Sequence, residues 1–594
     1  MATSQLETDV CIYGAGMGGV AAALTLLEQG YRVVVFEPTG WIGGQMTSQG
    51  VSALDEHEYV EEHPGTARYG ALRDAIRRRS ALLNGITGDV PHAYNPGNGW
   101  VSRLCFLPVV AHDILCEWFA PWIQAGTCVL VCNAHIISVA TSTQRIYSVQ
   151  CRTADQTITC SARLFIDAGE LGDVLNLAGC ETVSGAESYT DTKEDWAPQE
   201  ANPREVQGFT YSFAVEYVPH TSNIIAKPEG YIQLRTDQPF TLTLSGSDGV
   251  ARPFRVFDEG ITGLPPFWTY RRIREGKNCN PSQNDIALIN WNSNDYHRRT
   301  LIGATPHTIS SITDEAKRLS LAFLYYLQTD VPRDDGTGYG YPELRLRPDI
   351  MGTADGLSMA PYIRESRRTR GLARITAHDV LTTHQPHARA RHWPDTIGIG
   401  WYPLDLHPAP GNPTSRYEAT RPFQIPLGAS IPPDCHNLFC ANKNIATTHL
   451  SNGSYRLHPV EWSIGTGAGM AAAVALKHHT TPADIVRQKD LLHEVQRRLM
   501  HSGTALGWAI DVKPTDAIFV GTQWCISNDI LSDSSWRRSQ LRVAPDEPLT
   551  AAEYDRLQNA LMEWFGTQLP TNTSTEVTWR AASFFVQQLL AGEP

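Results

Sequence analysis

The sequence lacks a long apolar run, an excess of basic residues and a secretion signal. No stretch of about 18 apolar residues occurs in the 594 residues, so we expect no membrane-spanning helix. The 49 basic residues are outnumbered by 62 acidic ones, and the net charge of −13 argues against nucleic-acid and anionic-membrane partners. The first eight residues, MATSQLET, are polar and carry no basic flank or apolar core, so we expect a cytoplasmic protein.

Closely spaced cysteine pairs are also absent. The 12 cysteines are scattered, none forms a C-x-x-C pair, and several stand in apolar runs, as small buried residues do. This pattern disfavours a thiol redox relay, and we predict no metal site. The composition itself, with 42% hydrophobic and 19% charged residues, is typical of a globular protein long enough to bury a large core.

The first forty residues contain a dinucleotide-binding pattern. A short apolar run, Asp9–Tyr13, leads into a glycine-rich turn and a helical pattern at Val20–Gln29. A second apolar run, Arg32–Phe36, then ends at Glu37, about 20 positions after the last glycine. The order of strand, glycine turn, helix, strand and acid predicts a Rossmann-type unit.

Each part of this unit has a physical task. One glycine permits the tight turn off the strand, the next lets the backbone approach a pyrophosphate at the helix N-terminus, and the last lets the helix pack on the sheet. Glu37 would accept hydrogen bonds from ribose hydroxyls, which favours a ribose without a 2′-phosphate. The expected cofactor-binding residues of the turn are Gly14, Gly16, Gly18 and Gly19.

The residues after Glu37 favour FAD over NAD. A flexible Gly-Gly segment follows, and the run E-x-x-x-x-x-G-G-x-x-T-S resembles that of a large family of FAD-dependent oxidoreductases with a glutathione-reductase-like FAD-binding fold. The resemblance implies FAD as cofactor, with the residues after the two glycines near the isoalloxazine ring. The FAD contacts expected here are Gly43, Gly44, Gln45, Met46 and Thr47.

Three later segments extend the resemblance to about Gly503. Residues 167–173 (DAGELGD) resemble the D-A-T/G-x-x-G-D turn where this fold approaches FAD again. Residues 362–368 (YIRESRR) recur near the cofactor in this family, which implies that Arg364 and Glu365 hold the flavin or a bound anion. The alternative is an exposed, solvated charge run. Residues 454–469 (SYRLHPVEWSIGTGAG) resemble the block whose helix N-terminus points at the flavin. The segments add the expected FAD contacts Ala168, Gly169, Asp173, Arg456, Gly465 and Gly469.

One position departs from the family pattern. Asn442-Lys443 stands where many relatives carry Gly-Arg, which puts a backbone approach or an arginine contact at that place in question.

We predict an α/β fold: a Rossmann-like FAD-binding domain with an inserted α+β substrate domain and a helical C-terminal tail. The FAD-binding domain is expected at 1–201 and 341–503, the insert at 202–340 and the tail at 504–594. In the insert, strand-like runs include Phe209–Tyr217 and Tyr231–Leu234. In the tail, helical patterns cover Ala551–Phe565 and Thr578–Leu590. The oligomeric state stays open, as does the choice between a tail that docks on the core and one that mediates association.

The resemblance implies redox chemistry at the flavin N5 atom. No second G-x-G-x-x-G unit stands between two strands, so electrons are expected to come from an organic substrate and to leave to oxygen or a small carrier. The leading hypothesis is an FAD-dependent oxidase or dehydrogenase that oxidises a C–N or C–O bond of a small molecule by hydride transfer to N5. A NAD(P)H-dependent flavin monooxygenase and a non-catalytic FAD-holding protein are the alternatives.

Such a reaction usually needs a base near the ring. The C-terminal block offers three candidates for the base, and Arg364 could hold an anionic substrate or the reduced flavin. The candidate bases are His458, His449 and Glu461. Further candidates for substrate contact are Tyr362, Asp405 and His407.

Overall fold

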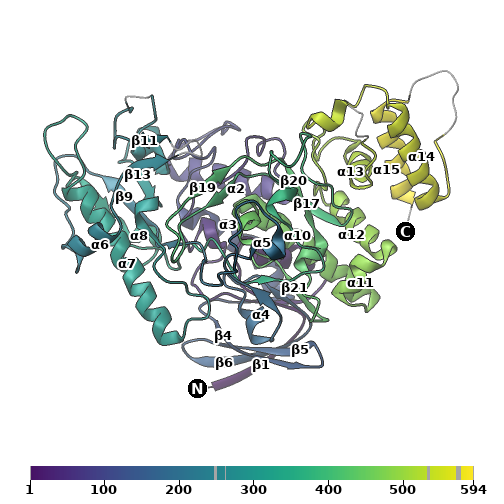
Figure 1. Ribbon diagram of the computed structural model, residues 1–594, viewed down its shortest axis with the longest axis horizontal. Helices are drawn as coiled ribbons and strands as arrows, with labels where there is room; N and C mark the ends of the chain where they lie inside the picture. The colour runs from purple at the N-terminus through teal and green to yellow at the C-terminus, as the bar shows by residue number, and fades with distance from the viewer. Residues whose placement is uncertain (1, 246–249, 261–262, 532–535, 570–576, 593–594) are drawn as a thin grey trace.

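The computed structural model describes residues 2–245, 250–260, 263–531, 536–569 and 577–592. The central sheet of the fold has seven strands in the order β3–β2–β1–β6–β5–β4, with β21 paired to the end of β6, and its strands β1, β4, β5 and β6 lie at the bottom of Figure 1. The strands are β1 (Ala2–Tyr13), β2 (Val33–Phe36), β3 (Cys128–Val131), β4 (His135–Ser142), β5 (Arg145–Arg152), β6 (Gln156–Asp167) and β21 (Leu438–Cys440).

The core of this sheet is parallel. Residues 10–13 of β1 pair with 33–36 of β2 on one side and with 164–167 of β6 on the other. On the far edge of β6, β21 pairs in parallel with residues 165–167. All four strands therefore end at one level, and their buried, mostly apolar runs are typical of a sheet covered on both faces. The predicted Rossmann-like α/β fold is confirmed.

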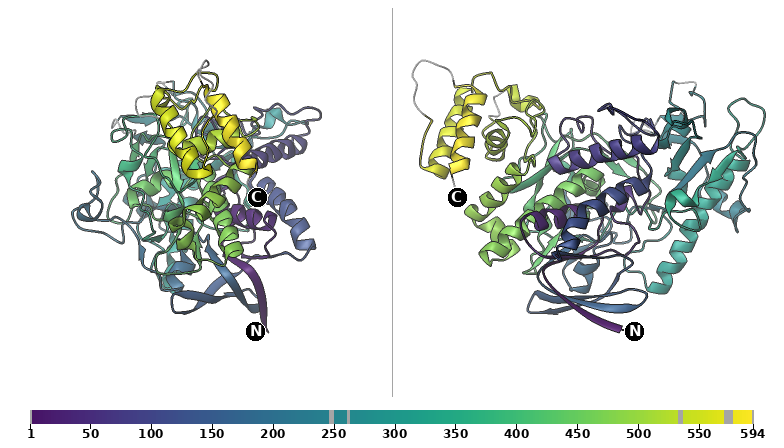
Figure 2. Two further views of the ribbon diagram at one scale, coloured as in Figure 1. Left: turned by 90° about the vertical axis from the view of Figure 1, so that its right-hand side faces the viewer. Right: turned by 180° about the vertical axis from the view of Figure 1, so that it is seen from behind.

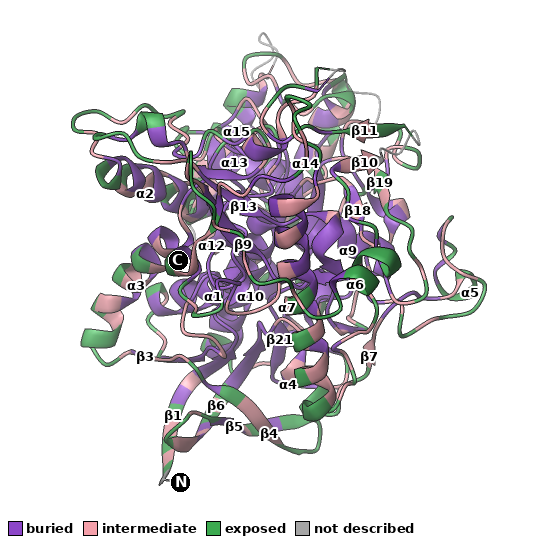
Figure 3. Ribbon diagram, turned by 90° about the vertical axis from the view of Figure 1, so that its left-hand side faces the viewer, coloured by how far each residue is buried: buried purple, intermediate pink, exposed green. Residues whose placement is uncertain are grey.

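Two glycine- and alanine-rich helices lie at the centre of the molecule: α1 (Met17–Glu28) and α10 (His458–His478). Nearly every residue of both is buried, as Figure 3 shows, because each lies between the sheet and other helices. The helices α2 (Ala67–Leu83) and α3 (Pro108–Gln124) are prominent when the molecule is seen from behind (Figure 2). Further helices of this region are α4 (Asp173–Leu177), α5 (Tyr189–Thr192), α9 (His449–Tyr455), α11 (Pro482–Arg487) and α12 (Lys489–His501).

A second hydrophobic core lies at the left of Figure 1, around a four-stranded sheet of order β12–β13–β9–β15. The sheet is formed by β12 (Arg272–Arg274), β13 (Ile286–Ile289), β9 (Phe213–Tyr217) and β15 (Leu344–Leu346). Around it lie β8 (Phe209–Thr210), β14 (Asp295–Tyr296), α6 (Tyr231–Asp237), α7 (Pro306–Thr329) and α8 (Pro348–Met351). The unit continues past residue 340, where we expected the insert to end, because β15 pairs with β9.

The amphipathic helix α7 covers this second core. Its buried positions Ile312, Ala316, Leu319 and Phe323 recur every three or four residues, which places them on one face. The strand expected at Tyr231–Leu234 is wrong, since those residues form the start of α6. The ring of Tyr231 packs edge-on against Tyr325 of α7, and this tertiary contact overrides the preference of the segment for a strand.

Short antiparallel pairs connect the second core to the C-terminal block. They are β17 (Thr396–Gly400) with β20 (Phe423–Pro426), and β18 (Leu404–Leu406) with β19 (Arg416–Glu418). The strand β18 lies directly against α9, where a side chain on Gly453 would meet the backbone of Asp405 at 2.9 Å.

The C-terminal tail docks on the core. Its helices are α13 (Phe519–Ser527), α14 (Ala551–Phe565) and α15 (Trp579–Gly592). A Cβ on Gly521 would lie 1.8 Å from the carbonyl oxygen of Ser583, so α13 and α15 approach closely through a glycine. Trp508 and Trp579 are both buried in the same hydrophobic core as the central sheet. Within the described residues, no helix is long and apolar enough to span a bilayer.

Candidate cofactor site and adjoining cavity

The four parallel strands deliver four loops to one edge of the sheet. The amide of Ala168 donates to the carbonyl of Tyr13 at 2.8 Å, and that of Ala441 donates to the carbonyl of Asp167 at 2.9 Å. The loops after β1, β6 and β21 are thus held side by side. In open α/β sheets, ligands bind outside the carboxyl ends of the strands at such a point.

The glycines of the first loop separate into two kinds. Gly14 has φ +93°, and a Cβ there would lie 2.3 Å from the carbonyl oxygen of Ala168. A Cβ on Gly18 or Gly19 would likewise meet a backbone oxygen, at 1.6 and 1.9 Å. At Gly16, the N-cap of α1, the nearest atom would be Oε1 of Glu170 at 3.0 Å. Gly14, Gly18 and Gly19 are therefore needed for packing, whereas the closest neighbour at Gly16 is a movable side chain. Gly16 forms a cradle at a helix N-terminus, where anions bind.

Glu37 is held rigidly beside this cradle. Its Oε2 accepts a hydrogen bond from the Ala15 amide at 2.7 Å, and its Oε1 accepts from the amide and hydroxyl of Thr39 at 2.9 and 2.7 Å. Burial raises the pKa of Glu37 to about 7. A fixed carboxylate one loop away from the glycine turn fits a ribose diol.

The Gly-Gly segment lies directly on the glycine turn. The amide of Gly43 donates to the carbonyl of Ala15 at 2.7 Å, and a Cβ on Gly44 would lie 2.7 Å from the Cα of Gly16. Met46 is fully buried, and the buried hydroxyl of Thr47 donates to the carbonyl of Ile42 at 2.8 Å.

Unpartnered polar atoms stand next to this segment. The Gln45 amide nitrogen donates to the carbonyl of Arg456 at 2.7 Å. Gln45 Oε1 and Arg456 Nε are buried, and neither has a hydrogen-bond partner in the part of the chain that the structure describes. Together with the cradle at Gly16, these atoms fit a polar cofactor, because buried polar groups otherwise find partners.

The loop after β6 lies opposite the glycine turn. The carboxylate of Asp167 accepts from the amides of Gly169 and Leu175 at 2.9 Å each, which shapes the turn into α4. Asp173 is half-buried in the first turn of α4, and its nearest cation is Arg367 at 3.9 Å. The backbone of Ala168 accepts from the side-chain amide of Asn442 at 3.1 Å.

A buried group of three charges occupies the position where the sequence departs from the family pattern. Lys443 is fully buried and forms ion pairs with Glu170 and with Glu461, the latter at 3.0 Å. The two carboxylates hold the pKa of Lys443 above its usual range despite its burial. Burial raises the pKa of Glu461 to about 7, so this carboxyl titrates near neutrality.

Two expected FAD contacts in α10 serve helix packing in this structure. A Cβ on Gly465 would lie 2.0 Å from the carbonyl oxygen of Gly18, and one on Gly469 would lie 2.7 Å from that of Ala22. Both glycines face α1, so they serve helix packing here, and the assignment of Gly465 and Gly469 to the cofactor stays a prediction. Their small size lets two helix N-termini lie together at the edge of the sheet.

The ring of His458 is held by backbone groups. Its Nδ1 accepts from the amide of Asp55 at 3.1 Å, and its Nε2 lies 3.1 Å from the carbonyl oxygen of Val51. Burial lowers the pKa of His458 to about 4. The ring is therefore neutral, and both of its nitrogens are engaged by backbone.

Arg364 links the two cores. It is buried, pairs with Asp295 at 2.9 Å and donates to the carbonyl of Gly208 and the hydroxyl of Thr210, each at 3.0 Å. Its charge is already paired with a carboxylate, and the expectation that Arg364 holds the flavin or an anion stays a prediction.

A chain of polar contacts runs from the Gly-Gly segment to a cavity. Arg456 donates to Tyr362 at 2.9 Å and pairs with Asp405 at 3.0 Å. The ring of His407 lies between Asp405, at 3.3 Å, and Asp295, at 2.5 Å. Although burial opposes it, the charges of His407 and Arg456 hold the pKa of Asp405 well below its usual range.

The cavity that this chain reaches has a volume of about 180 Å³. His449, at the N-terminus of α9, lines it, and its Nδ1 lies 2.9 Å from Oε2 of the fully buried Glu365. Burial alone would lower the pKa of His449, but the Glu365 carboxylate raises it above the usual value. The polar and aromatic side chains of the wall include Glu187, Glu194, Glu205, Trp196, His407 and Arg416.

The sequence did not predict how several of these residues pair. Glu365, which orients His449, and Asp295, which pairs with Arg364, are separated from their partners by 84 and 69 positions. Nothing in the sequence indicated a cluster formed by Asp195, His378 and His384, because Asp195 lies far from the two histidines along the chain. The one local signal for such contacts was a charged residue next to an arginine in an apolar segment, as in residues 362–368.

Comparisons with solved structures return matches at low similarity. L-proline dehydrogenase from P. horikoshii is 15% identical over 31% of this chain and 25% of that chain, with a TM-score of 0.16. p-Nitrophenol 4-monooxygenase from Pseudomonas putida is 10% identical over 84% and 85%, with a TM-score of 0.32. A geranylgeranyl bacteriochlorophyll reductase-like protein from Thermoplasma acidophilum is 8% identical over 95% and 98%, with a TM-score of 0.30.

The comparison of sequences identifies the family of the chain. No curated protein sequence matches the chain significantly. The profile of the family described as FAD dependent oxidoreductase matches residues 9–499, which include the glycine turn, Glu37, the Gly-Gly segment and α10. The chain is therefore a member of the FAD-dependent oxidoreductase family, with FAD as its cofactor.

Proposed function

We propose that this protein oxidises a C–N or C–O bond of a small organic molecule held in the cavity beside α9. Bound FAD would supply the hydride acceptor, its N5 atom. The electrons would leave to oxygen or a small carrier. The loops after β1, β2, β6 and β21 would hold the cofactor through Gly16, Glu37 and the Gly-Gly segment.

The observation that carries the proposal is the pair of His449 and Glu365. The carboxylate fixes Nδ1 of the imidazole at 2.9 Å, while the ring lines the cavity. A base that is oriented by a buried carboxylate is the arrangement used to remove a proton from a hydroxyl or amine. His449 would accept the heteroatom proton at Nε2 as the adjacent C–H bond is oxidised.

The wall of the cavity supports a substrate with hydrogen-bond donors. Glu187 accepts from the His449 amide at 2.9 Å and pairs with Arg368 at 2.9 Å, while Glu205 accepts from Asn412 at 2.7 Å. Carboxylates have further acceptor sites beyond these bonds. Amines and hydroxyls are therefore better suited to this wall than carboxylic acids are.

Anaerobic reduction of the bound flavin tests the proposal. At least one member of a panel of amines, amino acids and alcohols is expected to bleach the flavin, faster as the pH rises and His449 loses its proton. The substitution His449→Gln should slow bleaching by about 10²–10⁴-fold. It should leave the amount of bound FAD unchanged, as should the matched control His436→Gln on the surface.

Three results would argue otherwise. Reduction by NAD(P)H alone, with oxygen incorporated into an aromatic product, would indicate a monooxygenase. Bound flavin that no donor reduces would indicate a non-catalytic FAD-holding protein. Equal bleaching rates for wild type and His449→Gln would remove His449 from the chemistry.

A further inference from the structure

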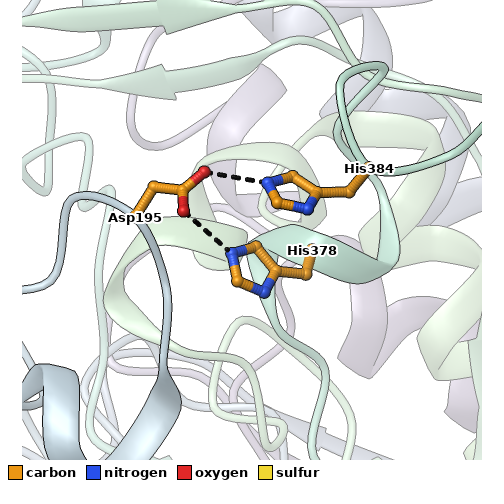
Figure 4. A group of neighbouring side chains, drawn as sticks. All are labelled: Asp195, His378 and His384. Carbon is orange, nitrogen blue, oxygen red and sulfur yellow. Dashed lines mark hydrogen bonds and ion pairs between the residues drawn. The ribbon is translucent and has the colours of Figure 1, made fainter.

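We propose that Asp195, His378 and His384 form a binding site for one divalent transition-metal ion, with Zn²⁺ the best suited. Figure 4 shows both imidazole rings turned toward the one carboxylate. Asp195 follows α5, His378 lies in a short 3-10 helix (Ala377–Asp379), and His384 follows it in the next turn. The ligand atoms of the three side chains all lie within 4.8 Å of one another.

The spacing of the three groups matches a small coordination sphere. A tetrahedral ion that binds nitrogen and oxygen at about 2.0–2.2 Å holds its ligand atoms roughly 3.3–3.6 Å apart. Nε2 of His384 lies 2.8 Å from one oxygen of Asp195, and Nε2 of His378 lies 3.6 Å from the other. A lengthening of about 0.5–0.8 Å in the first distance and a change of at most about 0.3 Å in the second would match this spacing.

One ring nitrogen in the cluster makes no hydrogen bond. Nε2 of His378 is shut off from solvent and makes no hydrogen bond with any described residue. The two rings are stacked, with centroids 3.9 Å apart and an angle of 25° between their planes. Two protonated imidazoles would repel at that distance, whereas two neutral ones can each donate a lone pair to a cation.

The backbone holds the ligands in place independently of an ion. Glu194, the neighbour of Asp195, accepts from the amide of Ala377 at 2.5 Å and from the hydroxyl of Thr448 at 2.7 Å. The side chain of Gln385 donates to the carbonyl of His378 at 2.7 Å. The two segments that supply the ligands are thus already fixed side by side.

Access to the cluster is open. The side chain of Asp195 is 52% exposed, and those of His378 and His384 are 29% and 31% exposed. An ion could enter from solvent and keep water as its fourth ligand, as three-ligand zinc sites do. Since the ligands come from segments nearly 190 positions apart, a bound ion would cross-link residues 194–198 to 376–385.

Zn²⁺ binding to the purified holoprotein tests the site. Competition with a chromophoric chelator is expected to reveal one site that His384→Ala and His378→Ala each weaken by more than about tenfold. Wild-type protein should unfold at a higher temperature with Zn²⁺ than with EDTA, and both variants should lose that shift. Co²⁺ should give the visible absorption of a low-coordinate site in the wild type and not in either ligand variant.

The surface residue His436 provides the matched control, and His436→Gln should bind Zn²⁺ as the wild type does. All three variants should unfold at the same temperature in EDTA, because the ligands are partly exposed. Equal Zn²⁺ affinity in wild type and the two ligand variants, or no binding by the wild type, would mean that the cluster is only a His–Asp ion-pair group. Either outcome leaves the test of flavin reduction unaffected.

Discussion

Replacing Gly16 by alanine should weaken FAD binding while the fold remains intact. Gly16 has φ −69° and ψ −166°, which alanine also adopts, and the nearest atom to its new methyl group is the movable carboxylate of Glu170 at 3.0 Å. Alanine also reduces the conformational entropy of the unfolded chain, which stabilises the folded state by about 0.4–1 kcal/mol. This gain offsets the cost of the close contact with Glu170. The net change in the free energy of unfolding should therefore be close to zero.

The effect on the cofactor should be much larger. The methyl group would occupy the cradle at the N-terminus of α1, where the backbone approaches the pyrophosphate. A hydrogen bond to a charged group contributes about 1.5–3 kcal/mol, and its loss corresponds to a roughly 10- to 150-fold weaker Kd for FAD.

Gly30 supplies a control with the opposite signature. It follows α1 with φ +85°, and a Cβ there would meet nothing within 4 Å. Alanine in the left-handed conformation costs about 1–2 kcal/mol, so Gly30→Ala should lower the unfolding temperature and leave the FAD affinity unchanged.

Flavin-fluorescence titration of the apoprotein gives the Kd, and circular dichroism gives the unfolding temperature. If Gly16→Ala binds FAD as tightly as the wild type, the glycine turn is not the pyrophosphate site and the reasoning fails. If Gly16→Ala loses FAD only because it unfolds, the distinction between Gly16 and Gly14 is wrong.

Three further predictions follow from buried side chains. Because burial raises the pKa of Glu37 to about 7 and ribose hydroxyls donate to the ionised form, FAD titrations should show about tenfold tighter binding at pH 8 than at pH 6, and Glu37→Gln should abolish this dependence. Burial raises the pKa of Glu461 in the folded state to about 7, so the folded protein binds this proton more tightly than the unfolded chain does. The stabilisation that results is fully present below about pH 4.5 and is lost as the pH rises through 7. Urea unfolding should show the wild type losing about 3 kcal/mol relative to Glu461→Gln over that range, and a pH-independent difference would contradict the burial argument. His458→Ala should lower the free energy of unfolding by about 1–3 kcal/mol for each of the two backbone groups it leaves unpaired. Flavin reduction in the folded variant should proceed at the wild-type rate. A slower rate would support His458 as a base.

Local patterns account for much of the fold. The apolar run at Arg32–Phe36 and the helical patterns at Val20–Gln29 and Ala551–Phe565 each correspond to an observed element, because periodicity and composition act over neighbouring residues. The strand expected at Tyr231–Leu234 failed for the converse reason: packing on α7 decided its conformation.

The sequence by itself determined the Rossmann-like unit, the cofactor and the approximate position of its loops, because glycine turns and an acid at a set spacing have few physical alternatives. Only the tertiary structure decided that Gly465 and Gly469 face α1, that Arg364 is neutralised by Asp295, and that His449 meets Glu365 at a cavity. It also brought Asp195 to His378 and His384. These contacts join residues tens to hundreds of positions apart, and their energies depend on burial and direction, which no spacing along the chain encodes.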